Sequence, residues 1–165
     1  MKKIIFIAIL TIATACSQEK FKEINNNRFS INYPSYFELD ESGESGTAFI
    51  LTSTKESNQE NDFVENINLI VADIGDLGFN QIADKSVNDV KGIATILEKK
   101  KFKQNGNDCL RLVFKAVQEG YHLTVIQHLL VKKGKVYVLT FTSDSEDYQD
   151  YLKDVDNSIS SFKLK

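Results

Sequence analysis

Four apolar-rich segments with strand character follow one another in the second half of this 165-residue chain. Links that contain glycine separate them, at Asn105-Gly106-Asn107, Glu119-Gly120 and Lys133-Gly134. Short glycine-containing links between such segments are typical of β-hairpins. The sequence therefore predicts an antiparallel meander of four strands, at residues 95–103, 109–117, 122–132 and 135–142.

Three earlier segments carry a similar signal. In residues 28–33, Phe29, Ile31 and Tyr33 alternate with polar residues before Pro34. This alternation is expected of a half-buried strand that a proline ends. Two further short strands are predicted on the same grounds at residues 47–52 and 66–72.

Two segments have helical spacing instead. Apolar residues recur every three or four positions from Phe79 to Val90, and Gly92 follows as a stop signal. Ser143 and Glu146 fit a capping box, which predicts that a second helix begins at Ser143. The expected fold class is therefore α+β, a single domain in which α-helices flank a mostly antiparallel β-sheet. The apolar stripe of the second helix consists of Tyr148, Tyr151, Leu152, Val155, Ile159 and Phe162.

The first fifteen residues have the three parts of a bacterial export signal. Lys2 and Lys3 form the positive end, residues 4–13 form an apolar run too short to remain as a membrane span, and small residues precede Cys16. These small residues resemble the lipobox of bacterial lipoproteins, in which the cysteine is lipidated. Ordinary secretory cleavage beside a chance cysteine is the alternative. We expect a lipoprotein signal peptide at residues 1–15, lipidated Cys16 and a polar tether at 16–27, and the folded domain at 28–165.

Charge argues against a nucleic-acid partner. The formal net charge is −3, and it becomes more negative once Lys2 and Lys3 leave with the signal peptide. The densest basic cluster, Lys99-Lys100-Lys101 with Lys103, is short and lies beside a turn, which indicates solvent-exposed surface. The expected partners are instead the membrane, bound through the lipid anchor, and a protein of the bacterial cell envelope, at either the inner or the outer membrane.

One cysteine remains if Cys16 carries the lipid. Cys109 then has no disulfide partner within the chain. It lies in an apolar-rich predicted strand, where a free cysteine usually behaves as a small buried hydrophobic residue.

Residues that carry enzymatic or metal chemistry are few. His122 and His128 are the only histidines, and in one strand they stand about 20 Å apart on the same face, too far to share a metal. The acidic group in residues 56–65 has oxygen atoms for weak Ca²⁺ binding but lacks the pattern of an EF-hand loop. None of the common nucleophile, phosphate-loop or zinc motifs occurs. We therefore expect no catalytic site, no metal site and no cofactor.

Two segments of the sequence resemble those of the PsbP-like superfamily, which includes DcrB-like bacterial lipoproteins. They are FSINYPSYFEL at residues 29–39 and KVYVLTFTSDSEDYQDYL at residues 135–152, the latter followed by SISSFKL at 158–164. The resemblance covers about residues 28–165. It implies an antiparallel sheet flanked by helices, in proteins that mostly act by binding other proteins. The matching motifs are structural, so the resemblance identifies no site residue.

These observations together predict a membrane-anchored lipoprotein of the cell envelope with a non-enzymatic accessory or protein-binding role. Two alternatives belong to other classes. One is an envelope enzyme with an unorthodox site around His122 or His128, which would need a carboxylate within hydrogen-bond reach. The other is a small-ligand carrier, which would need a concave apolar pocket between sheet and helix.

Overall fold

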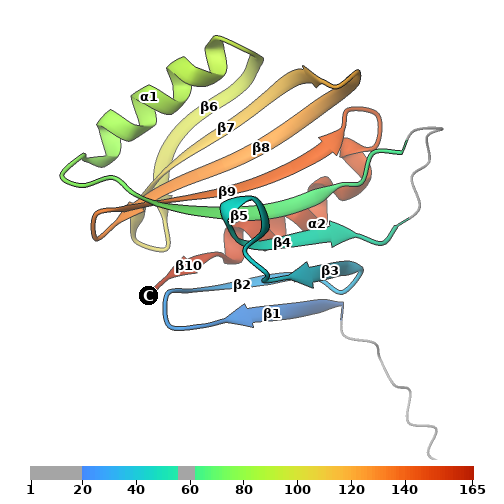
Figure 1. Cartoon of the computed structure of the whole chain (residues 1–165), viewed down its shortest axis with the longest axis horizontal. Helices are drawn as coiled ribbons and strands as arrows, with labels where there is room; N and C mark the ends of the chain where they lie inside the picture. The colour runs from blue at the N-terminus through green and yellow to red at the C-terminus, as the bar shows by residue number, and fades with distance from the viewer. Residues whose placement is uncertain (1–19, 56–61) are drawn as a thin grey trace, which may run out of the picture.

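A seven-stranded antiparallel sheet forms the centre of the computed structural model, which describes residues 20–55 and 62–165 (Figure 1). The strand order is β3-β4-β5-β9-β8-β7-β6, so chain neighbours lie side by side almost throughout. A short 3-10 helix, Glu44–Gly46, precedes β4. The strands are β3 (Phe37–Asp40), β4 (Thr47–Ser53), β5 (Asn66–Asp73), β6 (Thr95–Gln104), β7 (Asn107–Gln118), β8 (Tyr121–Lys132) and β9 (Lys135–Asp144).

The predicted meander is confirmed as β6 to β9, in which each strand pairs antiparallel with the next. Each hairpin has a two-residue loop, Asn105-Gly106, Glu119-Gly120 or Lys133-Gly134, and all six residues have positive φ. That conformation matches the right-handed twist of the flanking strands, and glycine adopts it without steric cost. The glycine links therefore set the register of the four strands.

Two helices cover opposite faces of this sheet (Figure 1). Helix α1 (Phe79–Lys91) ends at Gly92, as predicted, and buries Ala83, Val87 and Val90. Helix α2 (Tyr148–Ser161) packs on the other face. Alternation along β7 divides the two cores, because residues such as Leu112 face α1 whereas Val113 faces α2. The α+β fold class predicted from the sequence is confirmed.

A second, three-stranded sheet has the order β1-β2-β10 and completes the core on the α2 side. Its strands are β1 (Phe21–Asn25), β2 (Phe29–Pro34) and β10 (Lys163–Leu164). The alternating Phe29, Ile31 and Tyr33 of β2 are all buried, as their spacing predicts. β1, near the start of the described chain, and β10, near its end, both pair with β2, so this sheet brings the two ends together.

The predicted tether extends too far into the domain. Residues 21–25, expected to be part of it, form β1 and pair with β2, so that Ile24 lies opposite Ile31 and is 5% exposed. A strand with a single fully buried side chain gives no alternating pattern, which is why the sequence did not reveal it. The signal peptide and Cys16 lie outside the described residues.

The predicted capping box is wrong. Ser143 and Asp144 are the last residues of β9 and pair with β8, while α2 begins at Tyr148 with Asp147 as its N-cap. The strand continues because these extra ladder pairs satisfy backbone groups that a helix start would leave open. The Asp144 carboxylate then accepts a hydrogen bond from the Glu146 amide at 2.9 Å, which turns the chain towards the helix.

The stripe of α2 supplies the clearest stability test. Ile159 is completely buried, and Asn157 is exposed on the same helix. We expect Ile159→Asp to lower the free energy of unfolding by about 5 kcal/mol or more, because it removes buried apolar contacts and places an unpaired charge in the core. Asn157→Asp, which adds the same charge outside the core, is the control. Thermal unfolding followed by circular dichroism measures both, and an Ile159→Asp protein that melts like the wild type would contradict this packing.

Candidate functional site

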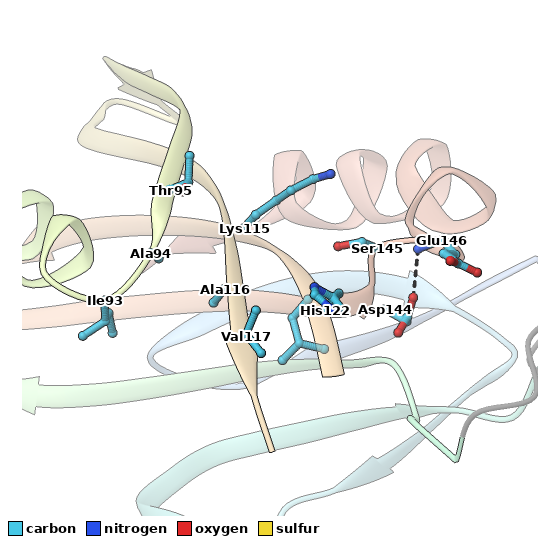
Figure 2. A pocket seen from close by; sticks show the side chains of 11 residues that line it. Ile93, Ala94, Thr95, Lys115, Ala116, Val117, His122, Asp144, Ser145 and Glu146 are labelled. Atoms are coloured by element: carbon cyan, nitrogen blue, oxygen red, sulfur yellow. Dashed lines mark hydrogen bonds between the residues drawn. The ribbon is translucent and has the colours of Figure 1, made fainter. Parts of the chain in front are cut away.

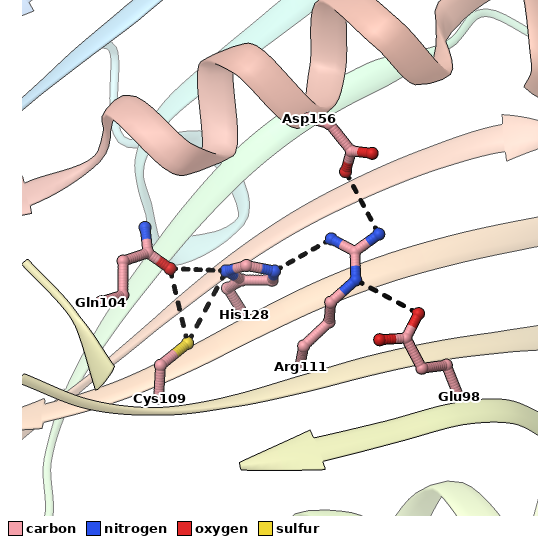
Figure 3. Close-up of polar contacts among 6 residues, drawn as sticks. All are labelled: Glu98, Gln104, Cys109, Arg111, His128 and Asp156. Carbon is pink, nitrogen blue, oxygen red and sulfur yellow. Dashed lines mark hydrogen bonds and ion pairs between the residues drawn. The ribbon is translucent and has the colours of Figure 1, made fainter. Parts of the chain in front are cut away.

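A buried polar network connects the central strands to α2 (Figure 3). His128 of β8 lies opposite Arg111 of β7, whose Nη1 is 3.0 Å from the imidazole Nε2. Gln104, at the end of β6, places its Oε1 2.7 Å from Nδ1 of the same ring. The Cys109 Sγ lies 3.6 Å from Nδ1 and 3.5 Å from the Gln104 Oε1. His128, Gln104 and Cys109 are each at most 5% exposed.

The contacts of this network determine where the protons are. The Gln104 Nε2 donates to the carbonyl oxygens of Ile159 at 2.6 Å and Phe162 at 3.3 Å, so its Oε1 must face His128 and accept from Nδ1–H. Arg111 can only donate, so the imidazole Nε2 must be an acceptor. His128 is therefore a neutral imidazole with its proton on Nδ1.

Electrostatics reinforces this assignment. Burial, and to a lesser degree the Arg111 guanidinium, lowers the pKa of His128 to about 3. Burial likewise raises the pKa of the Cys109 thiol to about 12. Cysteine nucleophiles depend on the thiolate, which such a pKa disfavours. The neighbouring thiol and imidazole are thus both neutral, and their contacts favour a structural role.

Arg111 connects the buried network to two carboxylates at the protein surface. Its Nη2 lies 3.1 Å from an Asp156 carboxylate oxygen on α2, and its Nε lies 3.4 Å from Glu98 on β6. The Arg111 side chain is 16% exposed, whereas both carboxylates are 45% exposed. Together with the Gln104 bonds to the end of α2, these contacts fix the helix along the sheet. Arg111 and Gln104 belong to no motif in the sequence, although an arginine within an apolar strand is a signal of a buried partner.

A second site is an open groove at the opposite end of β8, which contains His122 (Figure 2). The ends of β7 and β8 form its floor, the link from α1 to β6 forms one side, and the turn from β9 to α2 forms the other. The Ser145 amide donates to the His122 carbonyl oxygen at 2.8 Å and holds the turn against the strand. The lining residues are Ile93, Ala94, Thr95, Lys115, Ala116, Val117, His122, Leu123, Asp144, Ser145 and Glu146.

The groove exposes apolar side chains and charges side by side. Ile93 is 80% exposed and Val117 is 66% exposed, although both are large hydrophobic residues. Lys115 and Glu146 are also exposed, and neither makes an ion pair with any residue that the structure describes. Exposed apolar residues gathered in a hollow with unpaired charges at its edges are typical of a binding surface.

The two histidines thus belong to different sites, one buried and one in the groove. Within residues 20–55 and 62–165, no three His, Cys, Asp or Glu side chains gather in a geometry that suits a metal ion. Of the acidic group considered for calcium, Glu56 and Glu60 lie outside the described residues. Glu65 is 2% exposed and accepts a hydrogen bond from the Ser143 hydroxyl at 3.3 Å. Burial raises the pKa of Glu65.

Comparison with known proteins gives similarity of structure only. Neither protein-family models nor curated proteins match the chain. Among solved structures, cyanobacterial PsbP (CyanoP) from Synechocystis sp. PCC 6803 aligns over 92% of this chain and 96% of its own, with a TM-score of 0.64 and 15% identity. LpqN of Mycobacterium tuberculosis, a protein involved in cell envelope biogenesis, aligns over 88% and 90%, with a TM-score of 0.66 and 12% identity.

A third similar structure is a protein of unknown function from Pseudomonas aeruginosa, described as a putative regulator. It aligns over 86% of this chain and 94% of its own, with a TM-score of 0.62 and 11% identity. The fold is therefore PsbP-like, as the two sequence segments predicted. No helix within the described residues has both the length and the apolar character needed to cross a membrane.

The buried imidazole predicts a specific pH dependence. The pKa of His128 is about 3 in the folded protein and 6.5 in an unfolded chain, so the unfolded chain binds the proton more tightly. The free energy of unfolding must then fall as the pH drops from 6.5 towards 3, by about 1.4 kcal/mol per pH unit from this one group. His128→Asn, whose amide can replace the Nδ1–H donor, should remove this part of the slope.

Urea unfolding of the wild type and of His128→Asn at several pH values between about 7 and 4 measures the difference. The carboxylates titrate in both proteins, so only the histidine distinguishes the two slopes. His122→Asn is the matched control for loss of an exposed histidine. Parallel slopes for the wild type and His128→Asn would mean that the pKa of His128 is the same in the folded and the unfolded protein, and would contradict its burial as a neutral imidazole.

Proposed function

We propose that this chain is a lipoprotein of the bacterial cell envelope, anchored through Cys16, that acts without catalysis by binding another protein. The leader and the small residues before Cys16 support the anchor. Its fold is one it shares with LpqN, a protein involved in cell envelope biogenesis. The groove around Val117 is the proposed binding surface.

One observation carries the protein-binding role. Ile93 and Val117 remain 80% and 66% exposed at a hollow in the surface, beside Lys115 and Glu146, which make no ion pair within residues 20–55 and 62–165. Burial of such apolar side chains by a partner removes them from water, at roughly 25 cal/mol per Å². Large aliphatic residues that remain this exposed favour a surface that a partner covers.

The two alternative functions have less support. A site at His128 would need a free lone pair, yet its Nε2 accepts from Arg111 and its Nδ1–H donates to Gln104. For His122, no hydrogen bond from its ring to a carboxylate is present among the residues that the structure describes, and the Asp144 carboxylate in the same groove accepts from the Glu146 amide. A carrier would need a concave apolar pocket between sheet and helix. Between α2 and the sheet, buried rings such as Phe141 and Phe162 pack. The hollow between α1 and β6 is lined largely by polar residues such as Gln81 and Lys101.

The anchor is tested by Cys16→Ser. Without the cysteine no lipid can be attached, and the protein should move from the membrane fraction to the soluble fraction of lysed cells. Cys109→Ser, which alters the other cysteine, should leave the protein in the membrane fraction. Retention of Cys16→Ser in the membrane at the wild-type level would refute lipid anchoring.

The protein-binding role is tested by crosslinking in intact cells, followed by purification of the full-length protein and mass spectrometry. One envelope protein should be recovered reproducibly with the wild type. Ile93→Ser combined with Val117→Ser should lower its recovery about fivefold or more, because the apolar contacts are lost. The control is Leu77→Ser, which alters a residue that is 45% exposed and lies outside the groove. Equal recovery with the groove variant would exclude this surface.

A further inference from the structure

The last three residues of β7 have a strand neighbour on one side only. β6 begins at Thr95, which pairs with Lys115, whereas β7 continues to Gln118. Ala116, Val117 and Gln118 therefore pair with β8 alone among the described strands. In this antiparallel ladder, Ala116 and Gln118 direct their N–H and C=O groups to β8, so the N–H and C=O of Val117 are the ones that point towards the β6 side, next to the groove. An N–H and C=O without a strand partner on an edge can pair with another extended chain.

The side chains at this end of β7 do not discourage pairing with another chain, whereas those on the rest of this sheet edge do. Farther along the same edge of the sheet, β6 presents Lys99, Lys100 and Lys101, and lysines on an edge strand discourage pairing with another chain. The uncovered end of β7 carries alanine, valine and glutamine instead. Thr95, where β6 begins, and Ile93 just before it lie in the same groove, so an added strand would lie in line with β6.

Charge specifies the occupant further. Lys115 lies at the β7 side of the groove and Glu146 at the turn that leads into α2, as Figure 2 shows. Both are exposed and neither is in an ion pair within the described part of the chain. A polyanion such as a nucleic acid would complement only Lys115. A peptide with side chains of both signs complements both ends.

We infer that the groove binds an extended peptide segment of the partner protein, which pairs with the edge of β7 at Val117. An apolar side chain of the segment lies between Ile93 and Val117, an acidic side chain faces Lys115, and a basic one faces Glu146. Main-chain hydrogen bonds to β7 provide the general affinity, and these three side chains provide the selectivity. This inference rests on the proposed protein-binding function and specifies its binding mode.

The test is photocrosslinking in living cells with the full-length protein. A p-benzoylphenylalanine residue replaces Ile93 in one strain, and Leu39 of β3, a 39% exposed residue on the opposite edge of the sheet, in a control strain. We expect an adduct with one envelope protein at position 93 and none at position 39. Tandem mass spectrometry of the adduct should locate the attachment within one short segment that carries apolar, acidic and basic residues.

Variants then test each contact in the strain with the crosslinker at position 93. Val117→Lys should abolish the adduct, because a charged edge residue opposes strand addition. Lys115→Glu and Glu146→Lys should each lower its yield about two- to fivefold, as expected for the loss of one exposed ion pair. Leu39→Lys should leave the yield unchanged. Lys115 and Glu146 are surface residues, so these two variants test the inference even if Val117→Lys folds poorly.

Four outcomes would overturn the inference. They are an adduct of this chain with itself, an adduct with lipid alone, equal yields at positions 39 and 93, and yields unaffected by both charge reversals. A partner recovered by general crosslinking but not from position 93 would reject strand addition and leave the protein-binding function standing. Absence of a partner in both experiments would reject the function as well.

Discussion

The architecture depends on the burial of both faces of the central strands. Along β7, Leu110 and Leu112 are buried on one side, and Cys109 and Val113 on the other. A sheet with two apolar faces must be covered twice, and α1 and α2 provide these covers from opposite sides (Figure 1). The three-stranded sheet then closes the α2 side, where the fully buried rings of Phe29, Phe37, Phe49, Phe141 and Phe162 pack in one core with that helix.

Within this apolar core, the network of His128, Arg111 and Gln104 determines how α2 is placed. Apolar packing alone is nondirectional and tolerates small shifts of a helix along a sheet. The bonds from Gln104 to the last turn of α2 and from Arg111 to Asp156 are directional, and each requires a specific position of the helix. Because every polar atom in such a network must have a partner, its contacts oppose any shift that would break them.

Much of the fold could be predicted from local sequence patterns, and the site could not. The meander, the end of α1 at Gly92 and the buried stripe of α2 follow from glycine turns and from periodicity, which depend on residues close in the chain. The predicted start of α2 at Ser143 was wrong, because Ser143 can either cap a helix or pair in a strand. Only the position of β8 favours the strand. β1 was missed because its pairing with β2 leaves a single buried side chain.

The sequence by itself determined the fold class, the three tight hairpin turns and the apolar faces of both helices, because these properties are set by dihedral preferences and by the spacing of residues along one element. Only the tertiary structure decided that His128 is buried beside Cys109 while His122 lines an open groove, although both lie on one strand. It also decided that β7 continues for three residues beyond Lys115, the partner of the first residue of β6. These features depend on where separate elements end relative to one another, and no local pattern encodes such distances.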